Sequence, residues 1–126
     1  MAGTCTVTMK RGYIDNSLNS LRAYEFDFTA DSADASFPVA TLSSFGVVAG
    51  NIVDVAVIFD GTTAPDSLDV SITDGYGAVI YSAANLTATQ LRGLLSQIIP
   101  TVNGATVTLS GNAVNSAKVK IILYVV

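Results

Sequence analysis

Apolar and polar residues alternate along much of the chain, which is the pattern of strands with one face buried and the other in water. In residues 4–10 the apolar positions are Cys5, Val7 and Met9, and most positions between them are threonine. Residues 21–29 alternate in the same way and carry aromatic side chains on their apolar face. The pattern predicts further short strands at residues 37–42, 67–73, 78–81, 106–110 and 118–125.

Two segments are apolar on both faces. Residues 51–59 are apolar throughout except for Asp54, which predicts a central strand that is covered on both sides. Residues 118–125 have one fully apolar face, and their other face carries Ile122 and Tyr124. That second face is too apolar to lie in water, so we expect another part of the fold or a neighbouring subunit to cover it.

One segment has the period of a helix instead of a strand, because its apolar residues return every three or four positions. Thr87 is a favourable N-cap, Gln90 completes a capping box three residues later, and Pro100 ends the segment. We therefore predict one short helix near residues 88–98. Its apolar stripe consists of Leu91, Leu94, Leu95, Ile98 and Ile99.

These elements together predict the fold class. About eight short strands separated by turn signals, with a single short helix, indicate a mainly β protein. The expected architecture is an antiparallel β-sandwich, jelly-roll-like in its topology, with residues 1–126 as one domain. A β-barrel is the alternative.

Composition adds a question about the surface. Half of the residues are hydrophobic and only 13% are charged, so Ser, Thr, Asn and Gly must supply much of the polar surface. Partners that cover the surface are one explanation, and a threonine-rich β-protein of low charge is the other. The formal net charge is −4, and the stretch between Arg22 and Arg92 contains no basic residue but nine of the ten acidic ones. The scattered basic residues make us expect no nucleic-acid binding.

Catalytic machinery is not evident in the sequence. The chain has no histidine and only one cysteine, Cys5, so Ser-His-Asp and Cys-His sites and thiolate metal clusters are excluded. A carboxylate pair that joins Asp54 to Asp69 or Asp74 is the remaining catalytic alternative. We expect no enzyme activity, no cofactor and no metal.

Two binding alternatives rest on loop residues. Asp60, Asp66, Asp69 and Asp74 lie close in sequence and have the oxygen ligands that calcium prefers, although they lack EF-hand spacing. The turn around "DGYGAVIY" offers Tyr76 and Tyr81 for stacking on a sugar ring. Loop carboxylates more often form turns, and tyrosines beside a tight turn more often anchor it.

The N-terminal residues lack the charged, apolar and cleavage regions of a signal peptide. The apolar stretches are too short and too interrupted to span a bilayer. We therefore expect a chain made in the cytoplasm that has no membrane partner.

The second half of the chain, residues 64–126, resembles a group of small structural proteins of tailed-bacteriophage virions. An extended strand leads into a turn, then a Gly/Ala/Asn-rich loop, a "P-x-V-N-G" corner and a closing pair of strands. The matching positions are Ile72, Thr73, Asp74, Gly77, Asn85, Leu86, Pro100, Asn103, Gly104, Ser110, Gly111, Asn112, Asn115, Ser116, Ala117, Leu123 and Tyr124.

The resemblance implies a non-enzymatic β-sandwich of the virion, made in the host bacterial cytoplasm. Its expected function is that of a capsid cement or decoration protein that binds and stabilises the assembled head. The expected partners are the major capsid protein or other virion proteins, and a homo-oligomer, with a trimer favoured. A head–tail or tail accessory protein and a surface carbohydrate-binding or adhesion module are the alternatives.

Candidate contact residues come from three places in the sequence. The first is the N-terminal segment, the second is the set of acidic loops and turns, and the third is the outer face of the last strand. The candidates are Lys10, Arg11, Asp60, Asp66, Asp74, Tyr76 and Tyr124.

Overall fold

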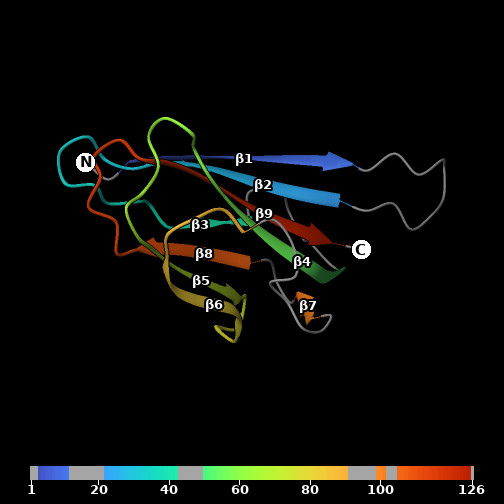
Figure 1. The fold of residues 1–126 in the computed structure, drawn as a ribbon. Coiled ribbons are helices and arrows are strands. Elements are labelled where there is room, and N and C mark those ends of the chain that lie inside the picture. Colours follow the sequence, from blue (N-terminus) through green and yellow to red (C-terminus); the bar gives the residue numbers. More distant parts are fainter. Residues whose placement is uncertain (1–2, 12–21, 43–49, 91–98, 102–104, 126) are drawn as a thin grey trace.

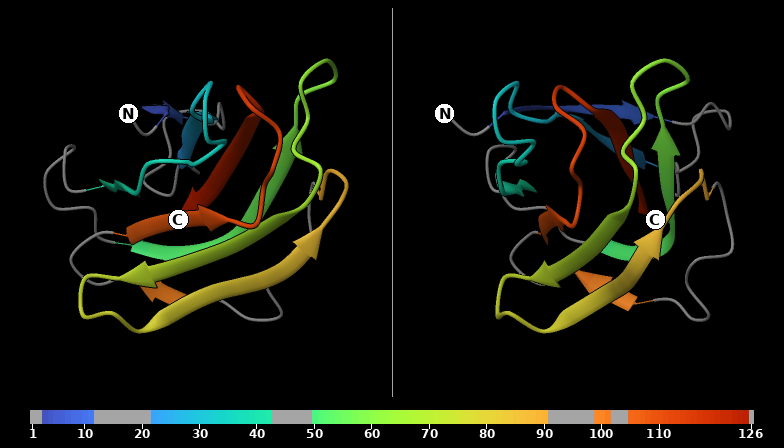
Figure 2. Two further views of the ribbon diagram at one scale, coloured as in Figure 1. Left: turned by 90° about the vertical axis from the view of Figure 1, so that its left-hand side faces the viewer. Right: turned by 60° about the vertical axis from the view of Figure 1, so that its left-hand side comes forward.

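A computed structural model describes residues 3–11, 22–42, 50–90, 99–101 and 105–125. The described strands form two antiparallel sheets that pack face to face (Figures 1 and 2). The five-stranded sheet has the order β1 (Thr4–Arg11), β2 (Arg22–Thr29), β9 (Lys118–Val125), β4 (Gly50–Phe59) and β7 (Ile99–Thr101). The four-stranded sheet has the order β3 (Ala40–Thr41), β8 (Ala105–Ser110), β5 (Leu68–Asp74) and β6 (Val79–Leu86).

The strand order is that of a jelly roll. Strands β2, β9, β4 and β7 face strands β3, β8, β5 and β6, and from β2 onward the chain changes sheet at every connection except the β5–β6 hairpin. This winding is the double-sheet arrangement of two Greek keys. Strand β1 adds a fifth strand outside β2. The predicted jelly-roll-like β-sandwich is confirmed.

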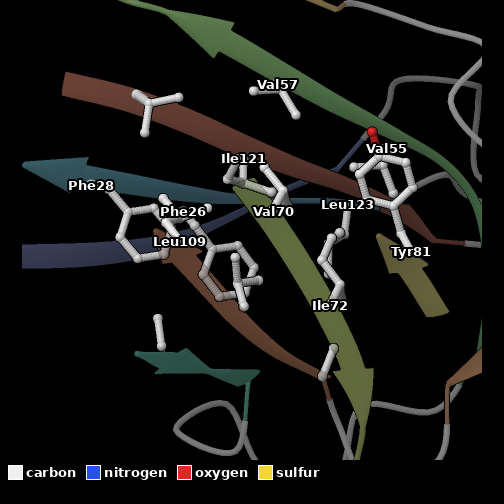
Figure 3. Close-up of a cluster of buried hydrophobic side chains, with 14 of the residues drawn as sticks. Phe26, Phe28, Val55, Val57, Val70, Ile72, Tyr81, Leu109, Ile121 and Leu123 are labelled. Carbon is white, nitrogen blue, oxygen red and sulfur yellow. The ribbon is translucent and has the colours of Figure 1, made fainter. Parts of the chain in front are cut away.

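The inward residues of both sheets form the core between them. Phe26, Ile121 and Val57 lie in one row across the five-stranded sheet and are fully buried against Val70 and its neighbours (Figure 3). Each of these residues alternates with an outward residue along its strand, which is why the two-residue period of the sequence identified them. The core is therefore one continuous apolar layer.

The aromatic residues of β2 pack at one side of this core. The rings of Phe26 and Phe28 lie parallel with centroids 6.2 Å apart. Phe37 meets Phe28 edge-on at 6.0 Å, so the segment that follows β2 is anchored to the same cluster. Such offset and edge-on contacts are the favourable geometries for aromatic pairs.

The last strand lies in the middle of the five-stranded sheet. All eight residues of β9 pair with β2, and β4 pairs along its other edge. Ile122 and Ala56 are neighbours on the outer face, yet they are only 9% and 0% exposed in the single chain. The chain itself therefore covers Ile122, and Tyr124 on the same face is half-buried.

The predicted helix near residues 88–98 falls mainly on residues 91–98, which lie outside the described residues. The residues on either side are extended. The backbone of Gln90 exchanges two hydrogen bonds with Val57, at 2.8 and 2.7 Å, and Ile99 pairs with Ile52. The capping role of Gln90 and the place of Ile99 in a helical stripe are therefore wrong, because the edge of β4 binds both residues.

Two predicted strands differ in length by more than one residue in the structure. Within residues 37–42 only Ala40 and Thr41 form a strand. Strand β6 continues to Leu86, beyond the predicted end at residue 81, and its register with β5 shifts twice. Asn85 has a φ of 58°, a left-handed conformation that asparagine tolerates, and it lies at the first of these shifts, between the partners of Leu68 and Val70. Among the described residues no helix is long and apolar enough to cross a membrane.

Candidate interaction surface

Three loops meet at one end of the sandwich, the end on the left of Figure 1. They connect β2 to β3, β4 to β5 and β8 to β9, and all three leave the sheets at the same end because their strands run in alternating directions. We call residues 30–37, 60–67 and 111–117 the loop platform. The acidic residues of the sequence that lie in these loops are thereby brought together.

Hydrogen bonds fasten the first loop to the third. The backbone N–H of Ala30 donates to the carbonyl of Ala117 at 2.8 Å. The side-chain amide of Asn112 donates to the carbonyls of Ala35, at 3.0 Å, and Val114, at 2.9 Å. Because Asn112 is partly buried, these bonds hold the two loops in one arrangement.

The second loop is fastened to the third in the same way. The N–H of Ala113 donates to Oδ1 of Asp66 at 2.9 Å, so this carboxylate bridges two loops. The N–H of Lys118 donates to the carbonyl of Thr63 at 2.8 Å, and the N–H of Asp60 donates to the carbonyl of Lys118 at 3.1 Å. The platform is therefore one connected structure.

The carboxylates of the platform accept backbone hydrogen bonds within their own turns. Oδ2 of Asp60 accepts the N–H groups of Thr62 and Thr63 at 3.0 and 2.8 Å. Oδ1 of Asp34 accepts the N–H of Ser36 at 3.0 Å and its hydroxyl at 2.7 Å. These bonds favour the charged form and hold the pKa of both carboxyls below the usual range. The turns are thus built on groups that stay negative.

The result is a negatively charged end of the molecule. The platform carries Asp31, Asp34, Asp60 and Asp66, and Asp69 lies beside it next to Gly111. Lys118 is a basic residue close enough to Asp60 at this end for its charge to act on that carboxyl. An acidic, preorganised set of loops suits a basic partner surface.

A hollow of about 570 Å³ opens next to the platform on the outer face of the five-stranded sheet. Glu25, Asp27, Asp60, Lys118 and Lys120 are among its lining residues. The hollow therefore mixes both charges, and its floor is formed by β2, β9 and β4.

Asp27 is the unusual group in this hollow. Its Oδ1 atom is buried without a hydrogen-bond partner, although the Nζ atom of Lys120 lies 3.9 Å away. Burial and the neighbouring carboxylate of Glu25 raise the pKa of Asp27, and the charge of Lys120 opposes that rise. The Glu25 side chain is only 12% exposed, and its Oε1 atom accepts a hydrogen bond from Nζ of Lys10 at 3.5 Å.

The candidate contact residues divide between the two ends of the sandwich. Asp60 and Asp66 both belong to the platform. Lys10 lies at the far end of β1 and pairs with Glu25, and Arg11 ends that strand opposite Arg22. The structure therefore brings together two of the predicted acidic residues and separates them from the predicted basic ones.

The remaining three candidates also lie away from the platform. Oδ1 of Asp74 accepts the N–H groups of Tyr76 and Ala78, each at 2.9 Å, and so builds the β5–β6 turn. Tyr76 is 78% exposed at the tip of this turn. Tyr124 is half-buried on the outer face, where it pairs with Asp54.

The geometry argues against three of the alternatives. Asp69 and Asp74 stand at opposite ends of β5, about 16 Å apart at the spacing of an extended strand, so the four aspartates cannot share one calcium ion. Among the described residues no three acidic or thiol side chains are grouped to hold a metal. Asp54 lies on the outer face of the five-stranded sheet, whereas Asp69 and Asp74 belong to β5 of the other sheet, where Asp69 points to the opposite outer face and Asp74 accepts the backbone bonds of the β5–β6 turn. Tyr81 is 8% exposed in the core, so it is not available to stack on a sugar beside Tyr76 (Figure 3).

The hollow and the role of Asn112 were not predicted from the sequence. The outward positions of β2 are acidic at Glu25 and Asp27, and those of β9 are basic at Lys118 and Lys120. This complementarity was visible in the alternation, but it points to a shared surface only once β2 is known to pair with β9.

Comparisons with protein-family models, with curated proteins and with solved structures find no match for this chain. The loop platform, the hollow and the resemblance of residues 64–126 to small virion proteins are therefore the observations that bear on function. Of these, the platform is the surface with the clearest physical character, because it combines fixed loops with charge of one sign.

Proposed function

We propose that the chain is a non-enzymatic structural protein of a tailed-bacteriophage particle, a capsid cement or decoration protein that binds the assembled head and stabilises it. The observation that carries this proposal is the loop platform. It supports binding because its loops are fixed to one another before any partner arrives, which lowers the entropy lost on association. The resemblance of residues 64–126 to small virion proteins supports the virion as the place where the protein acts.

The platform would bind a basic patch on the major capsid protein. Its charges would speed encounter and fix the register, more than they would add affinity. Only 13% of all residues are charged, as expected of a protein whose surface packs against neighbours. Because the protein would bind assembled shells better than free subunits, binding would raise the stability of the shell by linkage.

The experiment uses shells assembled from the major capsid protein without this chain. Purified protein is added, binding is measured by co-sedimentation, and shell rupture is followed by heating. We expect saturable binding that weakens as salt is raised and a higher rupture temperature for decorated shells. No binding, or binding without a shift in rupture temperature, would exclude the cement function.

A matched pair of variants tests the platform itself. Asp60→Asn removes a charge but keeps the oxygen that accepts the backbone bonds of the turn. Asp74→Asn makes the same change in the β5–β6 turn at the far end. We expect Asp60→Asn, and more so the double change of Asp34 and Asp60 to asparagine, to weaken shell binding, and Asp74→Asn to leave it unchanged. Equal effects of Asp60→Asn and Asp74→Asn would remove the platform as the binding surface.

A head–tail or tail accessory protein would use the same platform at a single vertex. The number of copies per particle distinguishes the two functions. Quantitative mass spectrometry of purified particles should find copies in proportion to the capsid subunits for a cement protein. A handful of copies would favour the accessory protein.

A further inference from the structure

The outer edge of β1 is unpaired among the described strands, because β1 ends the five-stranded sheet. All eight residues of β1 pair with β2 in continuous register, without a bulge. The strand contains no proline and no residue with positive φ. A long, regular edge presents a row of backbone donors and acceptors to which another strand can bind.

The other described edges are shorter or less regular. Strands β3 and β7 have two and three residues. Strand β6 has eight residues, but its register with β5 shifts twice and Asn85 has a φ of 58°. A strand that matches β1 in length and regularity is therefore β1 of a second copy.

The apolar face of β1 is incompletely covered. Cys5, Val7 and Met9 pack against the core but remain partly exposed, whereas the threonines between them are exposed. The reason is that the five-stranded sheet extends past its four-stranded partner at this side. A strand added to this edge would extend both the hydrogen-bonded ladder and the apolar stripe.

We propose that β1 pairs with β1 of a second copy in antiparallel register, about a two-fold axis at Val7. Opposite residues must lie on the same face of a sheet, so their numbers must sum to an even value. The sum of two opposite residue numbers is constant in an antiparallel pair and so defines its register. A sum of 14 pairs residues 4–10 of one copy with residues 10–4 of the other. Thr4 then faces Lys10, Cys5 faces Met9, Thr6 faces Thr8 and Val7 faces Val7 of the second copy.

Neighbouring registers are less favourable. A sum of 16 places Arg11 opposite Cys5 in the apolar row, and a sum of 12 leaves only residues 4–8 paired. The proposed register sets apolar residues against apolar ones and threonine against threonine, and it opposes no like charges. It is self-complementary, as a two-fold interface requires.

The interface is small, because one pair of edge strands buries less than the roughly 1,200–2,000 Å² of a stable complex. We expect a concentration-dependent dimer with a dissociation constant in about the micromolar range. This pairing does not depend on the proposed function. It differs from the trimer expected from the sequence, so the mass in solution distinguishes the two.

The first test is cross-linking in a Cys5→Ala background. Directly opposite residues have Cα atoms about 4.5–5.5 Å apart, within reach of a disulfide. We expect Val7→Cys to form a covalent dimer on mild oxidation. We also expect Thr6→Cys mixed with Thr8→Cys to form a heterodimer, whereas each of these alone does not, since its two copies lie about 8 Å apart.

The native thiol, which the Cys5→Ala background removes, is itself a poor cross-linker. Burial, and then the charge of Asp27, raise the pKa of Cys5 to about 11. The thiol is therefore protonated at neutral pH, and the thiolate is the reactive form.

The second test uses charge on the exposed face of β1. The double variant Thr6→Lys with Thr8→Lys opposes lysines across the two-fold axis, while Thr6→Lys with Thr8→Glu opposes lysine and glutamate twice. By sedimentation equilibrium we expect the first pair to weaken the dimer at least tenfold relative to the second. The stability of the single chain should follow the opposite order, because residue 8 lies opposite Glu25, where a lysine is more favourable than a glutamate. A difference in folding therefore cannot imitate the expected result.

Several outcomes would overturn the pairing. These are a monomer at every concentration with no Val7→Cys dimer, a trimer mass, or cross-links of Thr6→Cys alone as strong as those of the mixture.

Discussion

Aspartates have two opposite environments in this molecule. Asp34 and Asp60 accept backbone N–H groups, which favours their charged form. Asp27 has one oxygen buried without a hydrogen bond and a carboxylate neighbour, which disfavours the charged form. Charge in the platform is therefore supported by structure, whereas the charge of Asp27 is tolerated at a cost.

This cost leads to a prediction for Asp27→Asn. The folded pKa of Asp27 is raised, so its contribution to stability is fully present below its ordinary pKa and is lost as pH rises through the folded value. The variant should therefore gain stability relative to the native chain between pH 4 and pH 7. The side chain is 37% exposed, so solvent screening should keep the gain below about 1 kcal/mol.

Urea unfolding at both pH values measures the difference. Asp74→Asn, which makes the same charge change in an exposed turn, is the control. A native chain that is more stable than Asp27→Asn at pH 7 and equal to it at pH 4 would show that the contact with Lys120 outweighs burial.

A second prediction at this scale concerns Asn112. Its side chain donates to Ala35 and Val114 and accepts the N–H of Val114 at 3.0 Å. Asn112→Ala should lower the free energy of unfolding by about 1–3 kcal/mol, because partly buried groups lose their partners. Asn115→Ala, an exposed position in the same loop, should change it little. Equal losses in the two variants would mean that the side-chain bonds of Asn112 do not hold the loops together.

At the scale of elements, β9 should be intolerant of change on both faces. Ile121 is fully buried between the sheets, and Ile122 is 9% exposed on the outer face. We expect Ile121→Ala to cost about 2–5 kcal/mol and Ile122→Ala to cost at least half as much. Val79→Ala, at 64% exposure, should be near neutral. A negligible effect of Ile122→Ala in thermal unfolding would show that the outer face is open in the single chain.

The strands were predictable because their period is local. Residues 4–10, 21–29 and 118–125 differ from the observed β1, β2 and β9 by at most one residue at an end. Alternation does not show which strands are neighbours. It also cannot predict the structure of a segment whose backbone forms hydrogen bonds with a strand that is distant in sequence. Gln90 and Ile99 illustrate this, since the edge of β4 binds both despite their helical spacing.

The candidate site was predictable only in its parts. Asp60 begins an Asp-Gly turn and Asp66 lies in the same loop, and both were recognised from turn chemistry. That residues 30–37 and 111–117 join them could not be read from the sequence, because it depends on how the strands alternate between sheets. The bridge from Ala113 to Asp66 exists only in the folded chain.

At the scale of the whole molecule, acid should loosen the platform first. The pKa values of Asp34 and Asp60 are lowered, so the stability that they contribute is present above their ordinary value of 3.8 and is lost as pH falls through the folded values. Between pH 4 and pH 2, stability should fall less steeply in the variant with both residues changed to asparagine. Denaturant unfolding across this range measures the slope, and identical slopes would contradict the role of the two carboxylates.

The two proposed surfaces share no residue, although the edge of β1 begins beside the platform, where Thr4 pairs with Thr29. The platform occupies one end of the sandwich, whereas the edge of β1 runs along its side from Thr4 to Arg11 (Figure 1). One copy can therefore bind a shell and a second copy at the same time. Two linked platforms would bind a repeating lattice more tightly than one, provided that their spacing matches the lattice.

The central position of β9 also affects how the chain folds as it is synthesised. The strand that joins β2 to β4 follows the other eight described strands in the sequence, so it leaves the ribosome after them. Until then β2 and β4 each have an open edge, and the five-stranded sheet lacks its middle. Contacts such as that of Arg22 with Val125 span most of the sequence, and topologies of this kind fold slowly, in about milliseconds to seconds. Nascent chains would thus expose the unpaired edges of β2 and β4 until β9 is added. This interval gives a chaperone in the producing cell a defined period in which to act.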